Sequence, residues 1–153
     1  MKRDVGFWML IGIGVLLLIF LLFGQTLAVF DFNLAIALGL QETIGEIGKV
    51  GVAFAKGFAM ADTLVYVPLL ALGIIGLLTN KKWGYLAMLI SLGITVYWPV
   101  VHLYAIYIER EAINLDPEKY ISFPITLSFL MLYGLFGIWY LYKNPMKGYE
   151  EFS

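Results

Sequence analysis

The stretch that decides the fold is residues 58–108, FAMADTLVYVPLLALGIIGLLTNKKWGYLAMLISLGITVYWPVVHLYAIYI. It consists of two apolar runs, 58–79 and 83–108, separated by the polar turn Asn-Lys-Lys at residues 80–82. A helix rises about 1.5 Å per residue and the hydrocarbon core of a bilayer is about 30 Å thick, so about 20 apolar residues cross it. Both runs are long enough to cross the hydrocarbon core as helices. The stretch therefore predicts a hairpin of two membrane-spanning helices.

Two further apolar runs flank this hairpin, one over residues 5–30 and the other over residues 121–142. A signal peptide is the alternative for the first run. Because the apolar part of a signal peptide is only about 7–15 residues long, we expect a retained helix instead. The sequence thus predicts an all-α integral membrane protein, a bundle of four transmembrane helices that forms one domain over residues 1–153.

The connection between the first and second runs has a pattern of its own. Within residues 40–56, apolar and charged side chains recur at helical spacing on opposite sides. The apolar ones are Leu40, Ile44, Ile47 and Phe54, and the charged ones are Glu42, Glu46, Lys49 and Lys56. This pattern predicts an amphipathic helix that lies in the membrane interface between transmembrane helices 1 and 2.

The composition supports lipid as the solvent and excludes several classes of function. Hydrophobic residues make up 61% of the chain and charged residues 14%, against about 45–50% and about 25% in soluble domains. A net charge of −1 without a basic stripe predicts no nucleic-acid partner. The absence of cysteine excludes disulfides and thiolate metal sites, and the single histidine, His102, cannot supply two haem ligands. We expect no metal and no cofactor, and no motif of a soluble enzyme is present.

Lysine and arginine residues predict the orientation. With both termini in the cytoplasm, six basic residues lie inside in short segments, and four lie outside in longer ones. The inner set is Lys2, Arg3, Lys81, Lys82, Lys143 and Lys147, and the outer set is Lys49, Lys56, Arg110 and Lys119. Positive residues concentrate on the cytoplasmic side of membrane proteins. The prediction is a multi-pass protein of the cell membrane with both termini cytoplasmic.

Asp62 and His102 are the ionisable residues inside the predicted spans, and such residues by default suggest function. Counting from the turn at 80–82 at about 1.5 Å per residue places them at similar depth, in the outer part of the bilayer. Tyr66 and Tyr97 are level with each other in the same way. The predicted ligand-binding residues of an outward-facing pocket are Asp62, Tyr66, Thr95, Tyr97, Trp98 and His102. The structural alternative is that Asp62 caps the start of its helix and His102 bonds a neighbouring helix.

Four functions are compatible with these features. The first is binding of a small amphiphile or a lipid head group in the outer-leaflet pocket. The second is a small proton-coupled transporter that acts as a dimer. The third is a membrane-embedded enzyme with Asp62 and His102 as an acid–base pair, and the fourth is a structural or assembly subunit. The expected partners are membrane lipids, a small amphiphilic ligand and a second copy of the chain.

Overall fold

The computed structural model describes residues 3–108 and 110–146, and every element of regular structure within these ranges is a helix. In chain order they are α1 (Val5–Leu21), η1 (Leu22–Thr26), α2 (Leu27–Phe30), α3 (Phe32–Ala37), α4 (Ile44–Ala61), η2 (Asp62–Tyr66), α5 (Val67–Leu78), α6 (Lys82–Ile108) and α7 (Lys119–Lys143). Four continuous helical stretches are long and apolar enough to cross a membrane. They are Val5–Phe30, Ile44–Leu78, Lys82–Ile108 and Lys119–Lys143. The prediction of four long apolar helices is confirmed.

The second long helix begins earlier than predicted, at Ile44 rather than at residue 58. Thr43 Oγ1 accepts a hydrogen bond from the Glu46 N–H, and the Glu46 carboxylate accepts one from the Thr43 N–H. This capping box starts a helix at the next residue. Since no proline follows within α4, the helix continues through η2 into α5. Residues 44–56 are therefore the first part of a long helix, and the structure contains no separate helix over residues 40–56.

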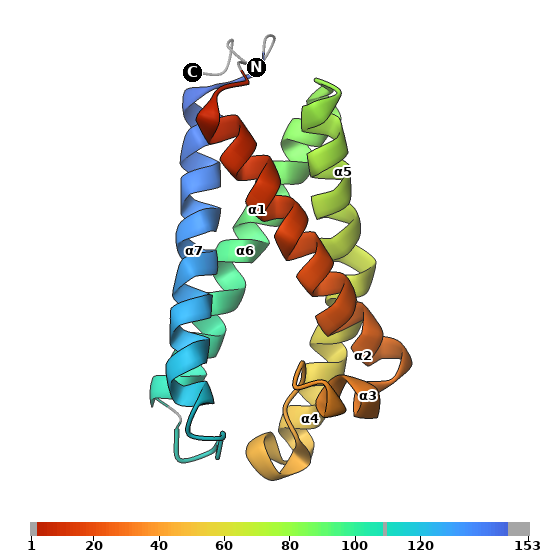
Figure 1. Ribbon diagram of the computed structural model, residues 1–153, viewed down its shortest axis with the longest axis vertical. Helices are drawn as coiled ribbons and strands as arrows, with labels where there is room; N and C mark the ends of the chain where they lie inside the picture. Colours follow the sequence, from red (N-terminus) through yellow and green to blue (C-terminus); the bar gives the residue numbers. More distant parts are fainter. Residues whose placement is uncertain (1–2, 109, 147–153) are drawn as a thin grey trace.

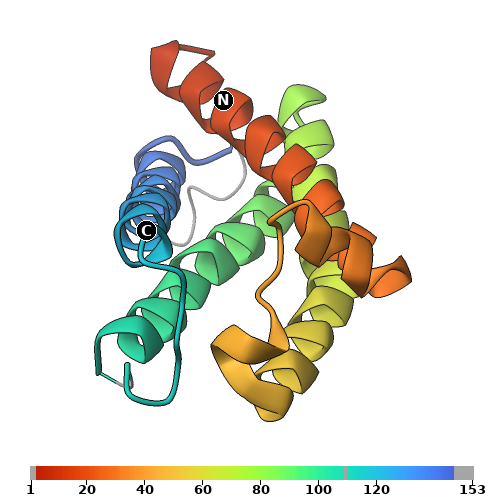
Figure 2. The same cartoon turned by 60° about the horizontal axis from the view of Figure 1, so that its bottom comes forward.

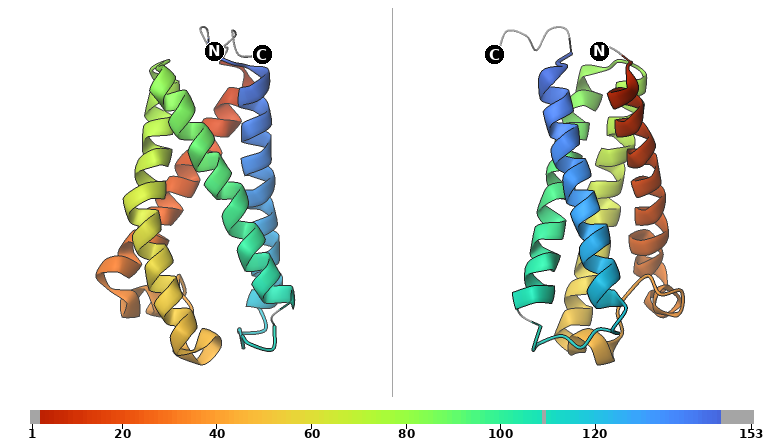
Figure 3. Two further views of the ribbon diagram at one scale, coloured as in Figure 1. Left: turned by 180° about the vertical axis from the view of Figure 1, so that it is seen from behind. Right: turned by 60° about the vertical axis from the view of Figure 1, so that its left-hand side comes forward.

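The helix α4 bends at Gly48, which has φ +68° and ψ 175°. A left-handed φ costs glycine little, whereas a side chain would be strained there. The bend turns the first residues of α4 away from the axis of the long helix, as Figure 3 shows at its lower end. It directs the capped start of α4 towards the loop that precedes α7.

The predicted hairpin is formed by α5 and α6. Asn80 in the turn has a left-handed φ of 56°, which asparagine tolerates better than most residues. The two helices touch through glycines, because a Cβ placed on Gly76 would lie 2.2 Å from the Gly84 Cα. Close contact of this kind is typical of helix pairs with small residues at the interface.

The four long helices form a bundle in which α6 packs against α5 on one side and α7 on the other. The helix α1 crosses in front of α6 and contacts both α5 and α7 (Figure 1). The start of α1, the end of α7 and the α5–α6 turn lie at the same end of the molecule. At the opposite end, α3 and the start of α4 lie on one side and the loop before α7 on the other (Figure 2).

The core lies between the long helices. Its fully buried side chains include Phe7, Leu10, Leu70, Leu77, Met88, Leu92 and Leu141. Two buried tyrosines donate hydrogen bonds to backbone carbonyls of neighbouring helices, Tyr133 to Leu10 and Tyr85 to Leu141, both at 2.9 Å. These bonds satisfy hydroxyl groups that would otherwise be costly to bury, and they tie α7 to α1 and α6.

Candidate functional site

A small cavity lies where all four long helices approach one another. Asp62 and Tyr66 come from η2, and Thr95 and Trp98 come from α6. Apolar walls complete it, with Leu17, Phe20 and Leu21 on the first long helix and Leu130 on α7. Its volume is about 10 Å³, which is room for about one water molecule. Four of the six predicted ligand-binding residues therefore line one cavity.

The hydroxyl groups of the cavity form a chain. Thr95 Oγ1 donates to the Ser91 carbonyl at 2.8 Å, and the Tyr66 hydroxyl lies 2.6 Å from Thr95 Oγ1. Because the threonine hydrogen is already directed at Ser91, the tyrosine is the donor to Thr95. The Tyr66 oxygen keeps its lone pairs for another donor.

Besides the Tyr66 oxygen, two members of the cavity lining, Asp62 and Trp98, have unused hydrogen-bonding capacity among the described residues. Asp62 is only 7% exposed, and within residues 3–108 and 110–146 it forms neither a hydrogen bond nor an ion pair. Trp98 Nε1 is the buried side-chain donor that finds no acceptor in the same ranges. Leaving such groups unpaired is costly. A polar molecule that donates to Asp62 and accepts from Trp98 would satisfy both.

The other two predicted residues lie outside this cavity. His102 Nδ1–H donates to the Trp98 carbonyl at 2.9 Å, and its ring stacks on the Trp98 ring with centroids 4.1 Å apart. No hydrogen bond or ion pair connects His102 with Asp62 in the part of the chain that is described. Tyr97 is 68% exposed, because it occupies the outer face of α6 between the buried residues Thr95 and Pro99. His102 therefore does not line the cavity itself, but it contacts Trp98, which does.

The capping alternative for Asp62 does not apply, since this residue lies inside a continuous helix rather than at its start. It opens η2, a turn of π-helix, and the first long helix contains a second such turn, η1. The two turns contact each other, and Thr63 Oγ1 donates to Thr26 Oγ1 at 3.1 Å. Pro68 follows η2 and crowds the carbonyl of Leu64, so the helix widens in the preceding turn. π-Turns often occur at functional sites.

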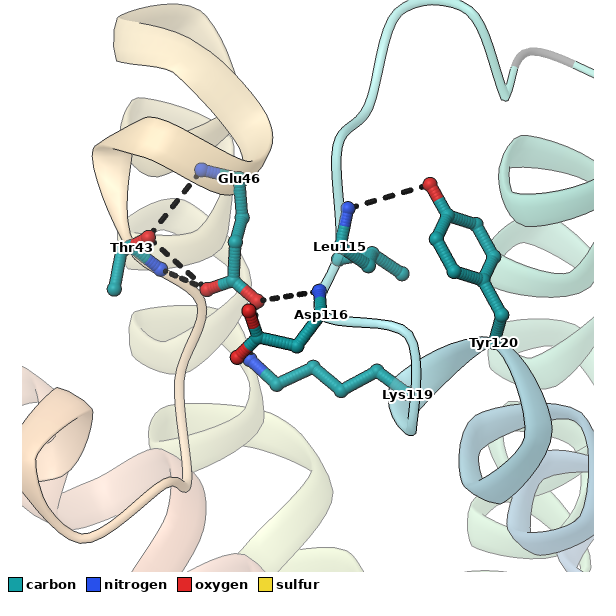
Figure 4. Close-up of polar contacts among 6 residues, drawn as sticks. All are labelled: Thr43, Glu46, Leu115, Asp116, Lys119 and Tyr120. Atoms are coloured by element: carbon teal, nitrogen blue, oxygen red, sulfur yellow. Dashed lines mark hydrogen bonds and ion pairs between the residues drawn. The ribbon is translucent and has the colours of Figure 1, made fainter.

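A second polar cluster, which the sequence analysis did not predict, joins the start of α4 to the loop before α7 (Figure 4). Lys119 Nζ lies 2.6 Å from Glu46 Oε1, and the Asp116 N–H donates to the same oxygen at 3.4 Å. The Asn114 N–H donates to the Glu46 backbone carbonyl at 2.8 Å. Nearby Glu42 has its carboxyl pKa raised, chiefly by burial. We call the contacts between Glu46 and residues 114–119 the α4–α7 latch.

The sequence showed Glu46 as part of the polar face of an interfacial helix and Lys119 as a loop residue. Nothing in their spacing indicated that they would meet, because they are far apart in the chain. Two of the basic residues used to predict the orientation, Lys2 and Lys147, lie outside the described residues. Among the described residues no group of acidic and histidine side chains is arranged to hold a metal ion.

Comparison with known proteins gives no further guide to function. The chain matches no family model, and neither a curated protein nor a solved structure is significantly similar to it. The cavity and the latch are therefore interpreted from their own chemistry.

Proposed function

We propose that this chain is a four-span membrane protein with cytoplasmic termini whose Asp62 cavity binds the head group of a small amphiphile in the outer leaflet. The observation that carries the proposal is a buried carboxylate and a buried indole N–H that line one cavity without partners of their own in the described chain.

The membrane location is supported by the surface of the long helices. Large apolar side chains are exposed along all four of them, among them Leu16, Phe23, Leu64, Ile75, Leu86, Ile125 and Leu132. Soluble proteins rarely expose contiguous apolar surface on this scale, whereas lipid tails cover it without cost. The lysines of the α5–α6 turn lie at the same end as the start of α1 and the end of α7, which agrees with one shared cytoplasmic side.

The depth of Asp62 supports an outer-leaflet site. It lies about 25 Å along the helix from the α5–α6 turn, so in a hydrocarbon core about 30 Å thick it is close to the outer boundary. Residues 44–61 then continue beyond the core, so Lys56 falls in the interface, whereas Lys49 and Glu46 lie farther out along the helix.

The chemistry of the cavity favours a cationic head group. Asp62 supplies negative charge, and the aromatic side chains of Phe20, Tyr66 and Trp98 line the same space. A carboxylate with aromatic rings around it is the arrangement that binds ammonium groups. Since the cavity holds about one water molecule, a head group enters only when the helices around Asp62 move apart. The widened turns η1 and η2 are the places where such movement costs least.

Proton-coupled transport by a dimer is the second candidate, and one observation favours it. A lone buried carboxylate beside space for one water molecule is suited to binding and releasing a proton. Against it, coupling sites of transporters usually lie near the middle of the membrane, whereas Asp62 is near the outer boundary.

The test uses the whole chain in phosphatidylcholine nanodiscs, with empty nanodiscs as the background. The probe is radiolabelled N-dodecylethanolamine, whose ammonium group can donate to the Asp62 carboxylate and whose hydroxyl oxygen can accept from the Trp98 N–H. We expect saturable binding that Asp62→Asn weakens at least tenfold. The control is Glu111→Gln, which removes an exposed carboxylate outside the cavity and should leave the affinity unchanged. Circular dichroism confirms that each variant keeps its helices.

Equal affinity of the wild type and Asp62→Asn would refute the proposal. Binding that survives in Asp62→Asn but is lost in Trp98→Phe would also contradict it, because the carboxylate would then not be the anchor. Proton uptake by proteoliposomes that disappears in Asp62→Asn, without any saturable binding of the probe, would favour the transporter.

A further inference from the structure

A second hollow, separate from the Asp62 cavity, lies at the corner where the first long helix ends and α3 begins. Its volume is about 370 Å³. The lining comes from both sides of that corner and from the facing side of α4, and includes Phe30, Asp31, Phe32, Lys56 and Met60. The corner is seen beside the labels α2 and α3 in Figure 1. We call this hollow the corner groove.

The corner groove carries one positive and one negative side chain. Lys56 Nζ lies 5.0 Å from the centre of the Phe32 ring, a cation–π contact that holds the amine at the groove. Asp31 uses Oδ1 to accept the Leu34 N–H at 2.9 Å. Although Asp31 and Lys56 line the same hollow, no ion pair joins them in the structure described. Opposite charges are therefore held apart across a space large enough for a ligand.

The rim of the corner groove is apolar. Phe30, the last residue of α2, is 82% exposed, and Met60 on α4 is also exposed. The groove stands at the end of an apolar stretch long enough to cross a membrane, where lipid head groups meet the hydrocarbon. A charged hollow with an apolar rim at that level is shaped for a molecule with a polar head and an apolar body.

We propose that the corner groove binds the head group of a zwitterionic phospholipid, with its phosphate at Lys56 and its ammonium group at Asp31. The lysine offers three N–H donors, of which the contact with Phe32 leaves some free for phosphate oxygens. The free lone pairs of the Asp31 carboxylate face the ammonium group. The two protein charges cancel, so the site matches a head group whose charges also cancel, and an anionic phospholipid would be repelled by Asp31. This inference does not depend on the Asp62 cavity.

The test uses the whole chain in dodecyl maltoside micelles free of phospholipid, titrated with dihexanoyl-phosphatidylcholine, and counts bound lipid by native mass spectrometry. We expect a saturable site that Asp62→Asn leaves intact and whose affinity falls at least tenfold in Lys56→Gln and in Asp31→Asn. The asparagine still caps α3, so the second variant removes charge without removing the cap. The control Lys49→Gln removes an exposed lysine of the same helix and should bind like the wild type.

Three results would overturn the proposal. The first is equal lipid affinity in Lys56→Gln and the wild type. The second is competition by inorganic phosphate at the lipid's own concentration, which would make the groove a site for free phosphate. The third is tighter binding of dihexanoyl-phosphatidylglycerol, which would mean that Asp31 does not select against anionic head groups. Loss of the N-dodecylethanolamine site in Asp62→Asn leaves this proposal intact, so the two proposals fail separately.

Discussion

The α4–α7 latch offers the sharpest prediction about this fold. Glu46→Gln keeps the length and shape of the side chain but removes the charge that faces Lys119, 2.6 Å away. The Asn114 N–H is a reporter that the substitution does not touch, because it donates to the backbone carbonyl of residue 46. If the ion pair holds the loop against α4, the hydrogen bond of this amide should break more often in the variant.

The magnitude follows from the burial of the two charges. Exposed ion pairs contribute about 0.2–1 kcal/mol, and hydrogen bonds to charged groups contribute about 1.5–3 kcal/mol. The Glu46 and Lys119 side chains are 8% and 19% exposed, so the pair belongs nearer the second range. We take about 2 kcal/mol, and since about 1.4 kcal/mol is tenfold, the local opening of the latch should increase about 30-fold.

The assay is hydrogen exchange of the Asn114 amide in nanodiscs, which reports local opening directly. The rate should rise about 30-fold in Glu46→Gln and stay unchanged in the control Lys49→Gln. In a Lys119→Gln background the same Glu46→Gln change should have a much smaller effect, because the partner is already missing. An Asn114 rate within about threefold of the wild type, or an equal effect in both backgrounds, would show that the ion pair does not hold the latch.

Two further predictions concern the hairpin and the orientation. Gly76→Ala should lower the free energy of unfolding by several kcal/mol, because its Cβ would lie 2.2 Å from the Gly84 Cα and α5 and α6 would have to separate. The control is Gly12→Ala, where a Cβ meets nothing within 4 Å. Equal unfolding free energies of the two variants would contradict the close packing. Alkaline phosphatase is active only outside the cytoplasm. Fused to the C-terminus it should therefore be inactive, and inserted after Arg110 it should be active. The opposite pattern would reverse the topology.

The sequence by itself was enough to predict four long apolar helices and to place three of them within two residues at each end. Runs of apolar residues such as 83–108 decide this locally, because each helix satisfies its own backbone hydrogen bonds and needs only lipid around it. The same reasoning identified Asp62 as a costly residue within a span and placed it, by depth, level with His102. Both inferences depend on distance along a helix, which is set by the rise per residue.

The extent of α4 and the local widening of the helices could not be predicted from such counts. The sequence suggested a separate helix over 40–56, whereas the Thr43 and Glu46 capping box and the lack of a terminator make one helix that bends at Gly48. The π-turn at η2 depends on how Pro68 and the facing turn of the first helix share space. A pattern of apolar and polar residues does not contain that information.

Only the tertiary structure decided which side chains meet. The rotation of α6 about its axis leaves Tyr97 exposed and does not bring His102 to Asp62, so that among the aromatic rings of the described residues His102 contacts only Trp98, four residues earlier on the same helix, and Phe58. The meeting of Glu46 with Lys119 likewise depends on where the bend in α4 and the loop before α7 come together. Helix rotation and crossing result from packing among all four helices at once, so residues at equal depth become neighbours only when that packing turns them towards each other.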